Sequence, residues 1–133
     1  MNTLPPKLSG ISAKMLLFYT EWHNILIRHI PKVLRYSLGI RIDNIFSGIL
    51  EDIALAQFSL PEYKTAYLKR AIGKNDTLKF MLYALFEMQG IDDKKFISLS
   101  QKAEEVGRML YGWKCKMEQK PLGTNGTKAE KSS

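Results

Sequence analysis

"FISLSQKAEEVGRMLYGWKCKM", residues 96–117, is the stretch that decides the fold class. Its apolar side chains recur at alternating steps of three and four residues, which places them on one face of an α-helix. Asp92 or Asp93 can cap the first turn of this helix. The seam consists of Phe96, Leu99, Ala103, Val106, Leu110, Trp113 and Met117. We therefore predict an amphipathic helix that buries this seam against other helices.

Three further segments repeat the same spacing and predict helices from about Ser12 to His29, Lys32 to Phe58 and Pro61 to Gln89. Pro31 and Gly90 suit the ends of the first and third of these helices. Gly73 and the following Lys-Asn-Asp can bend or loosen the third. The residues predicted to point inward are Ile11, Met15, Phe18, Trp22, Ile25 and His29, then Leu34, Leu38, Ile42, Ile45, Ile49, Ile53 and Ala56, then Tyr63, Tyr67, Ala71, Leu78, Leu82 and Leu85.

The predicted fold class is all-α, because no stretch shows the sustained alternation of a half-buried strand. Four amphipathic helices joined by short breaks indicate an antiparallel up-down four-helix bundle. We place this bundle at residues 11–117, after a flexible N-terminal segment (1–10) and before a disordered polar tail (118–133).

The composition is that of one globular domain with an excess of positive charge. The 133 residues include 20 Lys and Arg against 13 Asp and Glu, which gives a formal net charge of +7. A basic excess of this size favours an anionic partner such as nucleic acid, although an inert basic surface is the alternative. The lone Cys115 and the lack of a signal peptide or long apolar run indicate a cytoplasmic protein.

The sequence offers no candidate active site, so we expect a protein that is not an enzyme and needs no cofactor. Its two histidines, His23 and His29, are six residues apart on one predicted helix and cannot share a metal ion. We expect His29, on the apolar seam, to be a partly buried histidine. No catalytic residue and no metal ligand are therefore predicted, and no phosphate-binding loop is present.

Two clusters of basic residues are candidates for nucleic-acid binding. The third predicted helix contributes one cluster, and the turn between the first two helices contributes the other. Each cluster could instead be a solvated helix face, but two clusters on a basic domain favour contact with phosphates. Tyr63 and Tyr67 could add stacking surfaces beside the first cluster. The candidates are Lys64, Lys69, Arg70, Lys74 and Lys79 in the first cluster, and Arg28, Lys32, Arg35 and Arg41 in the second.

Four glycines inside the predicted helices lie beside the apolar seams, namely Gly39, Gly48, Gly107 and Gly112. A glycine costs a helix interior about 1 kcal/mol relative to alanine, so a close contact is expected in return. That contact is either another helix of the same bundle or a second surface, which would bind an identical subunit or a partner.

Two sequence runs resemble a known family of small four-helix bundle proteins. Trp22, Ile30-Pro31-Lys32 and the run "RYSLGIRI" at residues 35–42 match the family's opening motifs. "EEVGRMLYGWK", residues 104–114, is similar to its ending, with Tyr111 in place of a glycine. The family comprises the accessory variability determinant (Avd) proteins of diversity-generating retroelements, with relatives encoded in intervening sequences of bacterial 23S ribosomal RNA genes. The resemblance spans residues 18–116 and does not separate the two branches.

The retroelement branch implies a homopentameric barrel of bundles with a basic surface. It also implies binding to the element's reverse transcriptase and to RNA, and possibly to DNA, in support of error-prone cDNA synthesis during mutagenic retrohoming. The ribosomal branch implies the same fold with a structural or undefined role. An adjacent reverse transcriptase gene would indicate the first branch, and an rRNA gene the second.

Overall fold

A computed structural model describes residues 10–119 of the chain, which form four long helical rods. The elements are α1 (Gly10–Arg28), α2 (Lys32–Leu34), the π-helix η1 (Arg35–Gly39), α3 (Ile40–Phe58), α4 (Pro61–Glu87) and α5 (Asp93–Gln119). The second rod contains α2, η1 and α3 in direct succession. Residues 10–119 contain no strand, so the prediction of an all-α fold with four helices is confirmed.

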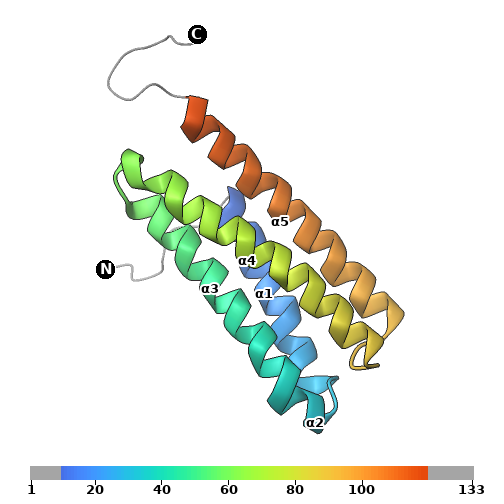
Figure 1. Cartoon of the computed structure of the whole chain (residues 1–133). Coiled ribbons are helices and arrows are strands. Elements are labelled where there is room, and N and C mark those ends of the chain that lie inside the picture. Colours follow the sequence, from blue (N-terminus) through green and yellow to red (C-terminus); the bar gives the residue numbers. More distant parts are fainter. Residues whose placement is uncertain (1–9, 120–133) are drawn as a thin grey trace, which may run out of the picture.

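The rods run alternately up and down and pack around a common core (Figure 1). α3 contacts α4, α4 contacts α5, and α1 contacts both α5 and α3, so that α1 and α4 lie on the diagonal. One end of the bundle contains the turn after α1, the short α2 and the turn between α4 and α5. Most of the predicted flexible segment (1–10) and polar tail (118–133) falls outside the described residues, but residues 10, 118 and 119 are helical.

Most of the predicted seam residues are buried, and an aromatic cluster fills the centre of the core. The Phe46 ring lies edge-on to Phe18, with centroids 4.6 Å apart, and stacks on Trp22 at 5.6 Å. Trp22 also donates a hydrogen bond from Nε1 to Asp43 Oδ1, 3.2 Å away, which satisfies the polar atom of this buried ring. The cluster ties α1 to α3.

Some inward predictions were wrong by one position or more. Phe46 is fully buried, whereas the predicted Ile45 is only partly buried, because the larger ring takes the place facing α1. Tyr63 is 54% exposed, since the interior of α4 begins with Leu68, one turn and a half later. His29 is exposed, and the buried apolar residue at this end of α1 is Ile30.

The predicted regular helix from Lys32 to Phe58 contains a π-helical turn at residues 35–39. A π-helix places each N–H opposite the carbonyl five residues back, so its turn is wider than that of an α-helix. Gly39 ends the segment and is buried against α1, where an added Cβ would come within 2.8 Å of Leu26 Cδ1. The glycine thus allows close packing inside the bundle.

The turn between α4 and α5 ends one helix and caps the next. Gly90 was predicted as the stop, but the left-handed residue is Gln89, with φ of 64°. Backbone N–H groups of Gln89 and Gly90 donate to the carbonyls of Phe86 and Leu85, which is the Schellman arrangement. Gly90 is required by its contacts, because a Cβ there would overlap the Leu85 side chain. α4 is one continuous helix through Gly73, the position at which we predicted that it can bend or loosen.

Candidate nucleic-acid interface

The nine basic residues predicted to bind nucleic acid fall into two groups in the structure. Five lie along α4, and four lie around the turn from α1 into α2 and η1. They differ in what surrounds them, which sequence patterns alone did not show.

Arg70 and Lys74 on α4 are held by a buried carboxylate on α3. The side chain of Asp52 is 1% exposed, and its Oδ2 lies 2.9 Å from Lys74 Nζ, while its Oδ1 lies 3.4 Å from Arg70 Nη2. Lys74 reaches Asp52 across Gly48, where a Cβ would lie 3.2 Å from Nζ. The Arg70 guanidinium also sits over the Tyr67 ring, 5.5 Å from its centroid. We call Asp52, Arg70 and Lys74 the Asp52 clamp.

The clamp changes what these two cations can do. A carboxylate removed from water is stable only when it is paired, so Arg70 and Lys74 compensate for the burial of Asp52. Neither carboxylate oxygen accepts a hydrogen bond of good geometry within the described residues, which leaves the ion pairs as its compensation. The sequence signal was an acidic residue three positions after Ile49, on the buried face of α3, and we overlooked it.

The other candidates on α4 have mixed environments. Lys79 Nζ lies 3.6 Å from Asp76 and 3.5 Å from Glu104. Lys64 Nζ donates to the carbonyls of Ala56 and Gln57 at 2.6 and 3.1 Å, so it covers the C-terminal end of α3. Lys69 is exposed and forms no ion pair within residues 10–119.

The four candidates near the turn after α1 are less engaged. Arg35 is partly buried and donates from Nη2 to the carbonyl of Ile30, 3.1 Å away. Arg28, Lys32 and Arg41 are exposed, and the ion pairs within the described part of the chain include none of them. We call Arg28, Lys32 and Arg41, with Tyr36 between them, the α1–α2 tip.

We did not predict Tyr36, at this tip, as a stacking residue from the sequence. Its side chain is 63% exposed, and it lies between Val33 and Ile40, which are 82% and 45% exposed. The two tyrosines that we had considered are placed differently: Tyr67 is partly buried beneath Arg70, and Tyr63 is exposed beside the engaged Lys64. An exposed tyrosine on a predicted amphipathic helix was the available signal.

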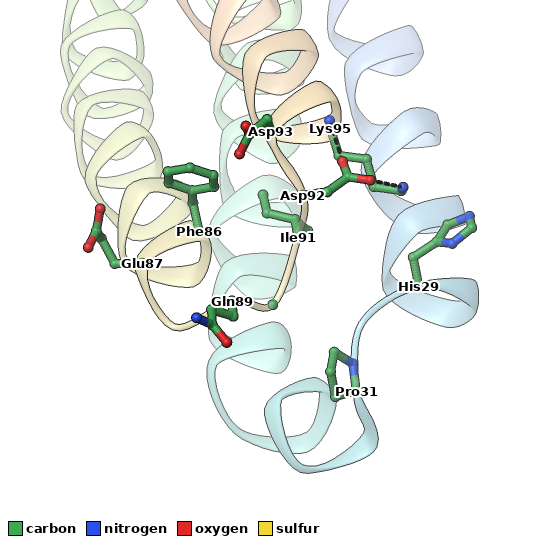
Figure 2. Close-up of a pocket in the computed structure, with 10 residues that line it drawn as sticks. His29, Pro31, Phe86, Glu87, Gln89, Ile91, Asp92, Asp93 and Lys95 are labelled. Carbon is green, nitrogen blue, oxygen red and sulfur yellow. Dashed lines mark hydrogen bonds and ion pairs between the residues drawn. The ribbon is translucent and has the colours of Figure 1, made fainter.

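An open hollow of about 610 Å³ lies beside the tip, between the α1–α2 turn and the α4–α5 turn (Figure 2). Asp92 caps α5, with Oδ1 accepting from the backbone N–H of Lys95 at 2.9 Å and Oδ2 lying 3.0 Å from Lys95 Nζ. The backbone hydrogen bond, then the side-chain one, lowers the pKa of Asp92. Figure 2 shows Glu87 and His29 on opposite sides of this hollow. Its acidic residues make it a poor phosphate site.

Three of the four off-seam glycines have neighbours inside the bundle. Gly39 faces Leu26, Gly48 faces Lys74, and Gly107 faces Asn75, whose Nδ2 would lie 3.1 Å from an added Cβ. Asn75 is buried and donates from Nδ2 to the carbonyl of Ala103, 3.0 Å away. Gly112 has open space around it and lines a shallow apolar groove.

Other features of the described residues add little chemistry. Residues 10–119 contain no group of three or more His, Cys, Asp or Glu side chains that could hold a metal ion. Cys115 is a partly buried free thiol. None of the helices in this part of the chain combines the length and apolarity needed to cross a membrane.

The described residues therefore define an all-helical bundle with unpaired cations at one end. No family model matches the sequence, and no curated protein matches it. Among solved structures, the chain resembles the crystal structure of a protein with unknown function from the S23 ribosomal protein family, from Bacteroides thetaiotaomicron VPI-5482. The match has a TM-score of 0.72 and 16% identity, and it covers 79% of this chain and 95% of the other. At this identity the likeness shows the fold.

Proposed function

We propose that this chain is a non-catalytic nucleic-acid-binding bundle that serves as the accessory subunit of a diversity-generating retroelement reverse transcriptase. The observation that carries nucleic-acid binding is the α1–α2 tip, where exposed cations have no acidic partner within residues 10–119. Cations that are not already neutralised are the ones that can displace counterions from phosphates.

The polymerase partner rests on the resemblance of the opening and closing motifs described above. In this role the bundle delivers and positions RNA, and the polymerase performs the chemistry of cDNA synthesis. The proposal includes self-association, with a homopentamer as the assembly that the resemblance implies. The open groove at Ile11, Met109, Gly112, Trp113 and Lys116 supports a contact surface beyond the bundle core, because it leaves apolar atoms uncovered.

A second candidate is favoured by the structural neighbour from the S23 ribosomal protein family. In that case the chain is a self-assembling bundle of the intervening-sequence branch, with a structural or undefined role and weak affinity for nucleic acid. The gene neighbourhood separates the two candidates, since only the first requires a reverse transcriptase gene nearby.

The direct test is to co-express the chain with the reverse transcriptase encoded beside it and to purify the polymerase by an affinity tag. We expect the chain to co-purify, to bind labelled template RNA in fluorescence anisotropy, and to raise the yield of cDNA. Light scattering at micromolar concentration should show a species several times the 15.2 kDa of one chain. Co-purification without any effect on RNA binding or cDNA would contradict the proposal.

A further inference from the structure

The chain carries several exposed aromatic side chains, and their surroundings differ. Phe80 is 70% exposed, but the adjacent Lys79 is paired with Asp76 and Glu104. Tyr63 is 54% exposed, but the adjacent Lys64 is bonded to carbonyls of α3. Neither aromatic therefore has a free cation next to it along its helix.

Two of the remaining tyrosines already have a cation on the ring. Arg70 covers Tyr67, and Lys114 Nζ lies 5.2 Å from the centroid of Tyr111. Tyr36 differs, because within residues 10–119 no ring and no cation packs on it. Its ring is available to a ligand.

Cations without an acidic partner in the described residues precede and follow Tyr36 along the second rod. Lys32 precedes Tyr36 by four residues, so it lies about one turn before it. Arg41 follows Tyr36 by five residues and lies in the first turn of α3, just after η1 ends. Arg28, across the turn from α1, adds a third cation without an acidic partner in the described residues.

The acidic residues at the same end of the bundle do not neutralise the cations of the α1–α2 tip. Asp92 is engaged with Lys95, and Asp43 accepts the hydrogen bond of Trp22. Glu87 and Asp93 lie at the hollow formed with the α4–α5 turn, which bounds the basic surface on that side. A phosphate chain is therefore favoured along α2 and η1 and disfavoured across the hollow.

We infer that the α1–α2 tip is a binding site for single-stranded nucleic acid, with Tyr36 as the surface on which one base stacks. Lys32 and Arg41 contact the phosphates on either side of that base, and Val33 and Ile40 extend the apolar platform. A free aromatic face flanked by cations is the arrangement that binds single strands, because a base must be unstacked from its neighbours to reach the ring. A base inside a duplex cannot do so, which gives the site its strand preference.

This inference rests on the proposed function, and the test separates the two. Fluorescence anisotropy of the full chain is measured with a labelled 20-nucleotide single-stranded RNA, the matching single-stranded DNA, and the RNA duplex, at several salt concentrations. We expect tighter binding to the single strands than to the duplex. Equal affinity for RNA and DNA would indicate recognition of base and phosphate alone, whereas a preference for RNA would add contacts to the 2′-hydroxyl.

Variants of Tyr36 distinguish stacking from simple apolar contact. Tyr36→Phe should keep single-strand affinity, whereas Tyr36→Leu should lower it by about 10-fold without a change in its salt dependence. Lys32→Gln and Arg41→Gln should each lower the salt slope by about 0.7. The matched control is Tyr111→Leu, because Tyr111 is 58% exposed but covered by Lys114. It should bind like the unmodified chain.

The contrary outcomes are specific. If no nucleic acid binds to the unmodified chain, the proposed function fails. If nucleic acid binds but Tyr36→Leu and Tyr36→Phe behave alike, or the duplex binds as tightly as the single strands, the inference fails and the proposed function stands. If the tip variants leave RNA affinity unchanged but abolish co-purification of the polymerase, the tip is a protein-docking surface, and the inference is overturned.

Discussion

The Asp52 clamp and the α1–α2 tip carry the same kind of residues and use them in opposite ways. In the clamp, Arg70 and Lys74 face a carboxylate that is almost fully buried, so part of their charge is neutralised inside the bundle. At the tip, Arg28, Lys32 and Arg41 have no acidic partner in the described residues. The sequence thus gives the number of cations on a helix. How many of them are free to bind a ligand depends on whether buried acidic residues of neighbouring helices pair with them.

The largest expected effect is on stability, and it separates the two regions. Replacement of both Arg70 and Lys74 by Ala leaves the Asp52 carboxylate buried without a partner. Breaking a buried ion pair in this way typically costs about 3–5 kcal/mol. We expect a loss of this order in the free energy of unfolding, measured by urea denaturation at one fixed protein concentration.

The matched control replaces two cations of the tip, Arg28 and Lys32, by Ala. Exposed and unpaired residues should change stability by less than about 0.5 kcal/mol. Adding Asp52→Asn to the Arg70/Lys74 double variant should recover much of its loss, because the unpaired buried charge is gone. If the clamp and tip variants lost the same free energy of unfolding, the proposed difference between the two regions would be wrong.

An effect of intermediate size, on the salt dependence of RNA binding, is expected when Asp52 of the clamp is replaced. Asp52→Asn keeps the shape of the side chain but releases Arg70 and Lys74 toward solvent. If the released cations bind phosphates, the salt slope of single-stranded RNA binding should steepen by about 0.7 for each additional phosphate neutralised. Salt titrations by fluorescence anisotropy would measure this change.

Glu51→Gln is the control for that experiment. It removes the same charge from the adjacent position of α3, but Glu51 forms no ion pair within residues 10–119 and is exposed. Its slope should stay near that of the unmodified chain. If both variants steepen the slope equally, the change in net charge alone explains the result. In that case the ion pairs with Asp52 do not keep Arg70 and Lys74 from contacting phosphates.

The sequence predicted the bundle well because the apolar seams contrast strongly with their polar surroundings. The seam of α5 is an example: Leu99, Ala103, Val106 and Leu110 are all buried as predicted. The pattern was less reliable where two apolar residues are adjacent, as with Ile45 and Phe46, because helical spacing alone cannot choose between them. The π-turn was also missed, because apolar spacing does not distinguish it from an α-helical turn; Gly39 at its end faces Leu26 of another helix, a contact that spacing along one helix could not show.

The candidate site was harder to predict, because its chemistry depends on partners from other helices. Asp52 and Asn75 are buried polar residues whose partners lie at least 18 positions away in the chain. Spacing along one helix could therefore not show that Arg70 and Lys74 are paired. Polymerase binding, RNA binding and the pentamer remain predictions from the resemblance and the charge.

The smallest expected effect concerns an exposed carboxylate at the other side of the tip, and it contrasts with the buried one of the clamp. Asp92 caps α5 through the backbone N–H of Lys95, and this bond lowers its pKa. A carboxyl whose pKa is lowered by folding stabilises the folded state above its unfolded pKa, and this contribution is lost as the pH falls through the lower, folded value. The window therefore lies below about pH 4.

Asp92→Asn isolates this contribution, because asparagine also caps a helix but does not titrate. The melting temperature of the unmodified chain should exceed that of the variant by a small margin at pH 6, and the margin should shrink as the pH falls from about 4 to about 3. Asp93→Asn is the control, since this neighbouring carboxylate lies in the same first turn and makes no hydrogen bond or ion pair among the described residues. If the difference in melting temperature between the unmodified chain and Asp92→Asn stayed constant with pH, the titration of Asp92 would not be its cause. Salt of about 1 M should weaken the margin only in part, because screening reduces the attraction between the Asp92 and Lys95 side chains but leaves the backbone hydrogen bond, the larger cause of the lowered pKa, in place.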